Sequence, residues 1–84
     1  RIHHTPGHSN GSVCFEIDNI LFSGDVVINK KPGRIDLPGG NKTKIVKTLH
    51  YLQNNFVGYT FYPGHGKGFV LDSAISKTLQ SHFL

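Results

Sequence analysis

The sequence has 84 residues, of which 37% are hydrophobic and 17% are charged. That length allows at most one small domain, and the composition is that of a folded chain rather than a disordered tail. No apolar run approaches the ~18–20 residues of a membrane span, and no signal or transit segment is visible, so we expect no membrane partner. The lone Cys14 excludes an internal disulfide framework and favours a reducing, cytoplasmic compartment.

Basic residues outnumber acidic ones, with nine Lys and Arg against five Asp and Glu and a net charge of +4. Six of the nine basic residues fall between Lys30 and Lys47. A stretch this basic is typical of a solvated surface, of a site for a small anionic substrate, or of a nucleic-acid contact. No aromatic-rich strip for base stacking accompanies it, so nucleic acid is the least favoured of the three.

The chain contains no Met and begins at Arg1, followed by the apolar Ile2. This start predicts that residues 1–84 are one part of a cut or truncated domain rather than a complete one. A chain of this size also buries only about 60–65% of the surface that its unfolded form exposes. We therefore expect a thin hydrophobic core.

The N-terminal half is predicted to consist mainly of β-strands. Residues 12–17 alternate in hydropathy, which places Val13, Phe15 and Ile17 on one face of a half-buried strand. In a complete fold that face should point into a core between two sheets. A turn at residues 18–19 leads to a second strand at 20–22, and a third is expected at 26–28. Residues 29–40, which hold two Pro and three Gly, are predicted to be a long ordered loop.

The C-terminal half is predicted to hold two amphipathic helices around one strand. Asn41 can cap a first helix that runs to about Asn55. Its apolar stripe has the spacing of a helix and comprises Ile45, Val46, Leu49, Leu52 and Phe56. A strand at 59–62 and a Gly-rich loop at 64–68 follow. Asp72 or Ser73 then caps a last helix, whose apolar residues are Ile75, Leu79 and Phe83. The order is β-β-β-α-β-α, an α+β arrangement.

Six histidines are present, and their positions separate them into groups. His50 and His82 fall within predicted helices, where a surface role is expected. His8 and His65 instead lie in loops framed by Pro and Gly, and Asp25 follows a buried-looking strand between them. Loops at one edge of a sheet can bring their side chains together, and imidazole with carboxylate suits Zn²⁺, Fe or Mn. The alternative for a single loop histidine is a capping or surface role.

Four motifs in order resemble the later motifs of the metallo-β-lactamase superfamily. They are HTPGHS at residues 4–9, LFSGD at 21–25, GRIDLPGG at 33–40 and YPGHG at 62–66. The most similar branch is the small glyoxalase II-like, or hydroxyacylglutathione hydrolase-like, enzymes. The resemblance covers nearly the whole chain and implies the second half of an αβ/βα sandwich of two mixed sheets with outer helices.

The resemblance also implies roles for individual residues. His8 matches a histidine ligand of the first metal, Asp25 the carboxylate that bridges both metals, and His65 the last histidine ligand of the second metal. Asp25 is then also the residue expected to take part in catalysis, by orienting both metals. Arg34 and Asp36 lie in the loop beside the site, where they either pair with each other to fix the loop or contact substrate.

The family motif His-x-His-x-Asp-His, which supplies two ligands to each metal, has no counterpart in residues 1–84. Each metal of the two-zinc site therefore keeps two of its four expected ligands, and the chain alone should be inactive. The resemblance implies that the complete protein hydrolyses a small anionic thioester or ester through a metal-bridging hydroxide, in partnership with the missing N-terminal half. The alternatives are a non-catalytic half-domain that binds or assembles, a remnant, or a hydrolase acting on another anionic substrate such as nucleic acid.

Overall fold

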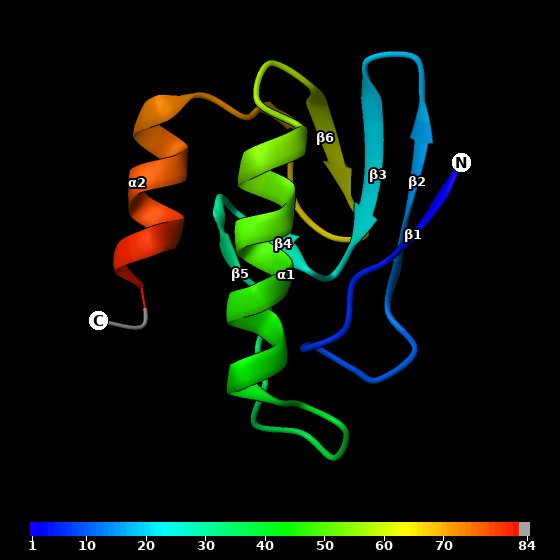
Figure 1. Ribbon diagram of the computed structural model, residues 1–84, viewed down its shortest axis with the longest axis vertical. Helices are drawn as coiled ribbons and strands as arrows, with labels where there is room; N and C mark the ends of the chain where they lie inside the picture. Colours follow the sequence, from blue (N-terminus) through cyan, green and yellow to red (C-terminus); the bar gives the residue numbers. More distant parts are fainter. Residues whose placement is uncertain (83–84) are drawn as a thin grey trace.

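The computed structural model describes residues 1–82, which form a mixed five-stranded sheet, a two-stranded ribbon and two helices (Figure 1). The sheet has the order β1-β2-β3-β6-β7. Its strands are Ile2–His4 (β1), Val13–Ile17 (β2), Ile20–Gly24 (β3), Thr60–Pro63 (β6) and Phe69–Val70 (β7). Only the β3–β6 pairing is parallel among these neighbours. The ribbon pairs Val27–Ile28 (β4) with Lys31–Pro32 (β5), and the helices are Lys42–Asn55 (α1) and Ser73–Ser81 (α2).

The predicted α+β class is confirmed, with three additions to the predicted order. Part of the expected loop at 29–40 is β5, which pairs with β4 across a two-residue turn. Two further short strands, β1 and β7, extend the sheet at its two edges. Strands of two or three residues are too short to show an alternating hydropathy pattern. They can be identified only when the strands that they pair with are known. Neither helix within residues 1–82 has the length and apolar character needed to cross a membrane.

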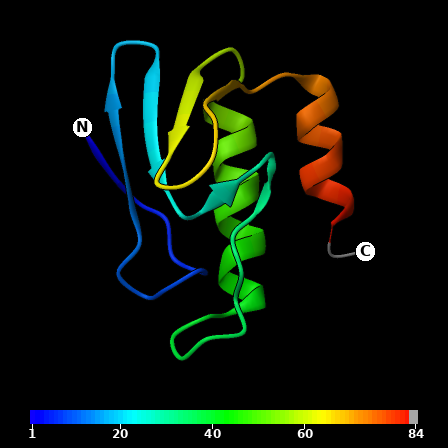
Figure 2. The ribbon, with the colours of Figure 1, turned by 180° about the vertical axis from the view of Figure 1, so that it is seen from behind.

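Helix α1 begins where the sequence predicts, because the Asn41 side chain accepts a hydrogen bond from the Lys44 amide at 3.0 Å. Its apolar stripe packs into the core, with Ile45, Leu49 and Leu52 each no more than 3% exposed. The helix lies along one face of the sheet in Figures 1 and 2. Burial of this stripe on the sheet is the main source of stability for the fold.

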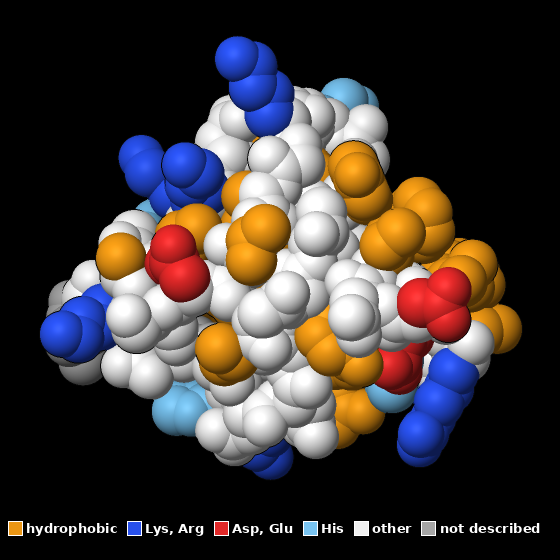
Figure 3. Space-filling model, turned by 90° about the horizontal axis from the view of Figure 1, so that it is seen from above, with side chains coloured by type: hydrophobic (Ala, Val, Ile, Leu, Met, Phe, Trp, Pro, Cys, Tyr) orange, Lys and Arg blue, Asp and Glu red, His pale blue; other side chains and the backbone are white. Residues whose placement is uncertain are grey.

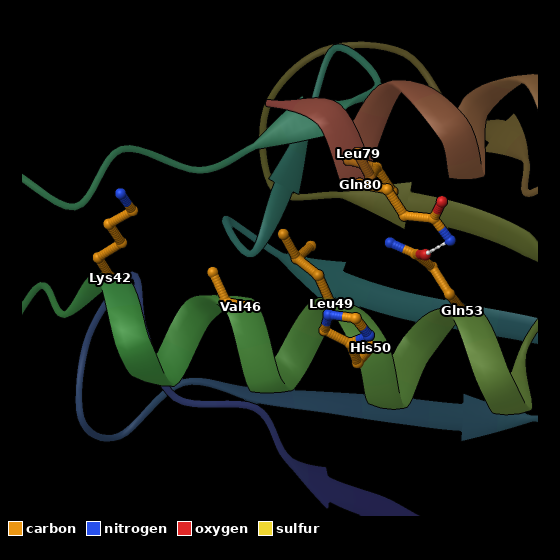
Figure 4. Close-up of a pocket in the computed structure, with 7 residues that line it drawn as sticks. All are labelled: Lys42, Val46, Leu49, His50, Gln53, Leu79 and Gln80. Carbon is orange, nitrogen blue, oxygen red and sulfur yellow. Dashed lines mark hydrogen bonds between the residues drawn. The ribbon is translucent and has the colours of Figure 1, made fainter. Parts of the chain in front are cut away.

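Helix α2 starts at a cap formed by Asp72, whose carboxylate accepts from the Ile75 amide. Leu79 is 1% exposed, whereas the predicted stripe member Phe83 lies outside the described residues. The Gln80 side chain donates to Gln53 Oε1 of α1 at 2.8 Å (Figure 4). A cavity of about 190 Å³ remains beside this contact between the two helices.

The two faces of the sheet differ sharply in exposure. On the helix side, Cys14, Leu21 and Phe61 are completely buried. The other face carries large apolar side chains that are 36–64% exposed, namely Ile2, Val13, Phe15, Ile17, Phe22 and Tyr62. Figure 3 shows hydrophobic side chains gathered on the strand side of the molecule. The alternating residues of β2 expected to face a second sheet thus form an open apolar face in residues 1–82.

A hydrogen-bonded network joins β1, β2, α1 and β6 at the end of the sheet where β2 turns into β3. His3 is 7% exposed, and its Nε2 donates to Glu16 Oε1 at 2.8 Å, while its Nδ1 lies 2.7 Å from the Tyr51 hydroxyl. The Tyr59 hydroxyl donates to Glu16 Oε2 at 2.8 Å. The hydrogen bonds from His3 and then Tyr59 lower the pKa of Glu16. His3 is therefore a structural residue of the sheet.

The open apolar face, formed by the six residues above, predicts self-association of the 84-residue chain. At ~25 cal/mol per Å², even ~400 Å² of uncovered apolar surface is worth on the order of 10 kcal/mol, similar to the whole stability of a small domain. In size-exclusion chromatography the chain should elute well above its 9.3 kDa mass. The double change Phe15→Ser with Ile17→Ser should shift it toward the monomer.

Val57→Ser is the matched control, because Val57 is 60% exposed but follows α1 and does not belong to the sheet face. It should leave the elution volume unchanged. A sharp monomer peak for the unmodified chain, with cooperative thermal unfolding, would mean that residues 1–84 close their own core.

The Glu16 network predicts that stability falls in acid. A carboxyl whose folded pKa is lowered stabilises the fold above its unfolded pKa, and that stability is lost as pH falls through the folded pKa. Melting temperature should therefore drop between about pH 6 and about pH 3 in the unmodified chain. Glu16→Gln should be less stable at pH 6 and show a flatter profile, and Tyr59→Phe should lie between them. Parallel profiles for all three proteins would contradict this origin of acid sensitivity.

Candidate metal centre

The parallel strands β3 and β6 finish at the same end of the sheet, and each is followed by a candidate ligand. Gly24 is registered with Pro63 across the pair, so Asp25 and His65 follow neighbouring strand ends. The Gly64 amide donates to the Gly24 carbonyl at 2.8 Å, which fastens the two loops together beyond the strands. Figure 2 shows the loop after β6 passing beside the segment that leads from β3 to β4.

Asp25 lies between the two candidate histidines, with one carboxylate oxygen toward each. His65 Nδ1 lies 2.8 Å from Asp25 Oδ1, in hydrogen-bond contact. His8 Nε2 lies 3.8 Å from Asp25 Oδ2. The Asp25 and His8 side chains are 32% and 22% exposed, whereas His65 is 77% exposed. The structure thus brings together the three residues that the sequence grouped, in a partly open position.

His8 is oriented by a backbone carbonyl from the GRIDLPGG loop. Its Nδ1 lies 2.6 Å from the carbonyl oxygen of Arg34, so Nδ1 carries the hydrogen and donates it. His8 Nε2 then lies on the side of Asp25. A ligating histidine commonly donates its second ring nitrogen to a carbonyl or carboxylate in this way, which fixes the tautomer and the ring orientation.

The loop that carries His8 is anchored to the start of α1. The Asn41 amide donates to the Gly7 carbonyl at 2.8 Å, and the Thr48 hydroxyl donates to the Pro6 carbonyl at 2.7 Å. A side chain at Gly7 would collide with the backbone of Ile45, and its φ of +139° is also unfavourable for other residues. Because position 7 is glycine, the loop can pack closely against the helix, and this packing fixes the position of His8.

Two further glycines leave room for the Asp25 carboxylate. A Cβ at Gly64 would lie 2.9 Å from Asp25 Oδ1. A Cβ at Gly33 would collide with the Asp25 carbonyl oxygen and lie 3.3 Å from His8 Nδ1. The backbone of both loops can approach Asp25 because these positions lack side chains. The Pro-Gly pairs in these loops were the feature of the sequence that could have predicted this close packing.

Arg34 and Asp36 form a two-point ion pair with each other at the surface. Arg34 Nε donates to Asp36 Oδ1 at 2.7 Å and Nη2 donates to Oδ2 at 2.9 Å, with both side chains more than 60% exposed. This pairing raises the pKa of Arg34 and lowers the pKa of Asp36. The pair holds the loop whose Arg34 carbonyl orients His8, a contact that the sequence did not reveal.

The other histidines lie away from Asp25. His4 Nε2 donates to the Asn10 carbonyl at 2.9 Å, and His50 is exposed on α1. His3 belongs to the buried network with Glu16, and His82 follows the end of α2. The grouping by loop position therefore distinguished His8 and His65, which lie beside Asp25, from the other four histidines.

Two imidazoles and a carboxylate match the donor preferences of zinc, iron or manganese, and the glycine cradle leaves Asp25 accessible. Within residues 1–82, however, no three His, Cys, Asp or Glu side chains form a group that could hold a metal ion by themselves. His65 is hydrogen-bonded to Asp25 rather than aimed with it at a common point. The donor chemistry fits a metal, but the ligand set needs further groups.

A family model described as the metallo-beta-lactamase superfamily matches residues 1–72. The chain belongs to the metallo-beta-lactamase superfamily. The mixed sheet with two helices is part of the superfamily fold.

Related proteins extend well beyond the length of this chain. The probable metallo-hydrolase YqgX of Bacillus subtilis is 42% identical over 65 residues, an alignment covering 74% of this chain and 31% of that protein. The probable metallo-hydrolase MJ0888 of Methanocaldococcus jannaschii is 35% identical over 66 residues, covering 75% and 32%. The chain therefore spans about a third of the length of these curated relatives.

A solved structure, TTHA1623 in a di-iron-bound form, superposes with a TM-score of 0.86 at 34% sequence identity. The match covers 100% of this chain and 42% of that chain. The fold of residues 1–82 is accordingly a partial superfamily domain.

The incomplete ligand set predicts weak zinc binding by the isolated chain. Structural zinc sites with four ligands bind zinc with a free energy of about 10–16 kcal/mol. If half of the ligands contribute half of that binding free energy, the dissociation constant is between about 0.2 mM and about 1 μM. Isothermal titration calorimetry should therefore give a weak isotherm, and Asp25→Asn should weaken binding at least about tenfold.

His50→Gln is the matched control, because His50 is exposed on α1 away from Asp25, and it should leave the isotherm unchanged. A tight isotherm with two zinc ions per monomeric chain would show that residues 1–84 complete the site without further ligands.

Proposed function

We propose that this chain is the C-terminal part of a metal-dependent hydrolase that cleaves a small anionic thioester or ester of the hydroxyacylglutathione type. Superfamily membership and the probable metallo-hydrolase names of its relatives support a hydrolase parent. The observation that carries the proposal is Asp25, whose two carboxylate oxygens face histidines from two different loops. A carboxylate so placed is suited to bridge two metal ions.

In this proposal each residue of the chain has a distinct task. His8, held by the Arg34 carbonyl, would help to hold one metal through Nε2, and His65 would help to hold the other. Asp25 would help to hold both, because its two carboxylate oxygens face the two histidines. When bound, the metals would supply an activated hydroxide at neutral pH and polarise the substrate carbonyl. The Arg34–Asp36 pair keeps the loop in place and leaves its acceptor carbonyl aligned with His8.

The glyoxalase II-like assignment rests on the GRIDLPGG loop and the order of the four motifs. Zinc is the proposed metal, with iron or manganese as alternatives, and the di-iron form of TTHA1623 shows that a structural relative holds iron. Asp25 itself would suit any of the three, since carboxylate oxygen is a ligand for each.

A non-catalytic half-domain is the second candidate, because no group within residues 1–82 could hold a metal by itself. The open apolar sheet face gives such a half-domain a surface on which another domain half could pack. Both candidate functions require the complementary half of the domain. A measurement of catalysis distinguishes the hydrolase from the non-catalytic half-domain.

The test is reconstitution. The chain would be co-expressed with the N-terminal segment of TTHA1623 that precedes the matched region, and hydrolysis of a hydroxyacylglutathione thioester would be followed in the presence of zinc, iron or manganese. We expect activity in the reconstituted pair and none in either part alone. Asp25→Asn should lower kcat/KM by at least about 10³-fold, since it disturbs both metals at once.

His50→Gln should retain the activity of the reconstituted pair, because His50 lies on α1 outside the centre. A stable, soluble pair that binds two metals yet hydrolyses no thioester or ester would favour the non-catalytic candidate.

A further inference from the structure

A basic cavity of about 570 Å³ opens beside the candidate metal centre. Its walls come from the β4–β5 turn, with Asn29 and Lys30, and from the loop after β6, with Gly66, Lys67 and Gly68. The second segment directly follows His65, so one wall of the cavity continues from a candidate ligand. Neither the metal proposal nor the family motifs assign a role to these residues.

The charges on the cavity walls are all of one sign. Lys30 and Lys67 both belong to the lining, which includes no carboxylate. Within residues 1–82, the backbone amides of Gly66 and Lys67 donate to no protein acceptor that would compete for them. Two cations on separate loops, with unbonded amides between them, are suited to hold an oxyanion.

The backbone at Lys30 has a positive φ, a conformation that costs a lysine more than it costs a glycine. Asn29 and Lys30 are the two central residues of the β4–β5 hairpin, with φ of +53° and +63°. Glycine is the residue that most readily adopts positive φ at the second of these positions, whereas Asn tolerates the first. A lysine there carries a conformational cost that glycine would remove.

Packing links this strained turn to the loop of His65. A Cβ at Gly66 would lie 2.6 Å from the Asn29 side-chain oxygen, so the two loops approach closely only because position 66 is glycine. Gly66 has a φ of +84°, which glycine also accommodates best. The ammonium of Lys30 is therefore carried on a turn that is packed one residue away from His65.

We propose that Lys30 and Lys67 form a subsite for an anionic group, a carboxylate or a phosphate, on the molecule that the neighbouring metal centre acts upon. The assignment of that molecule as the substrate rests on the proposed function, whereas oxyanion binding by the cavity does not. The subsite lies to one side of Asp25, so it would bind a charged tail while the reactive carbonyl occupies the metal centre.

The test is anion binding by the metal-free chain, fused to a soluble carrier protein and followed through its backbone amide resonances by NMR at constant ionic strength. The probes are inorganic phosphate and acetate, with acetamide as the neutral control. We expect saturable shifts at Lys30, Gly66, Lys67 and Gly68 with at least one anion and none with acetamide. Phosphate alone would assign the site to phosphoryl groups, and acetate would assign it to carboxylates.

Variants separate a built subsite from general surface charge. Lys30→Gly and Lys67→Ala should each weaken anion binding about two- to fivefold, and the double variant about tenfold. Lys30→Gly should also raise the melting temperature, because it relieves the positive φ while removing the cation. Lys77→Ala, which removes an exposed cation on α2, should change neither quantity.

Shifts that do not saturate, or that weaken equally in Lys77→Ala, would overturn the proposal. So would a lower melting temperature for Lys30→Gly, since Lys30 would then have a structural role. Because the experiment needs neither metal nor turnover, its failure would leave the proposed hydrolysis standing. Loss of activity in the reconstituted pair would equally leave the anion site standing.

Discussion

The parallel pairing of β3 with β6 is the constraint on which the rest of the structure depends. It joins segments about 40 residues apart in sequence and makes their ends coincide at one edge of the sheet. The hydrogen bond from the Gly64 amide to the Gly24 carbonyl continues the pairing past the strands. Asp25 and His65 meet for this reason, and the basic cavity forms because the chain continues from His65 into Gly66.

Helix α1 provides the second support, and it serves the core and the site together. One side of the helix buries Ile45, Leu49 and Leu52 against the sheet. Its first turn holds the loop of His8 through the Asn41 amide and the close approach of Gly7. Packing that stabilises the fold thus also positions a candidate ligand, since loss of the helix would release the loop.

Two features of the chain point to the same missing material. The sheet presents an apolar face that a second layer would cover, and within residues 1–82 no group of three His, Cys, Asp or Glu side chains could hold a metal ion by itself. The matched relatives are about three times as long as the aligned part of the chain. The uncovered sheet face and the incomplete ligand set can therefore have one cause. In a sandwich of two layers, the second layer that covers the sheet face can also bring metal ligands to the end of the sheet.

The sequence by itself determined the α+β class and the caps at Asn41 and Asp72, because these follow from local periodicity and from residues that carry their own capping chemistry. It grouped His8, Asp25 and His65 by their loop positions and by the family resemblance, and the β3–β6 pairing brings Asp25 and His65 together. It also predicted that Val13, Phe15 and Ile17 share one face of β2 and that this face is uncovered in the chain, and these side chains are 36–57% exposed. Tertiary structure alone decided the carbonyl contact from Arg34 to His8, the short strands β5 and β7, and the buried role of His3. Each depends on a partner outside its own segment, and such pairing leaves no mark on the local pattern of that segment.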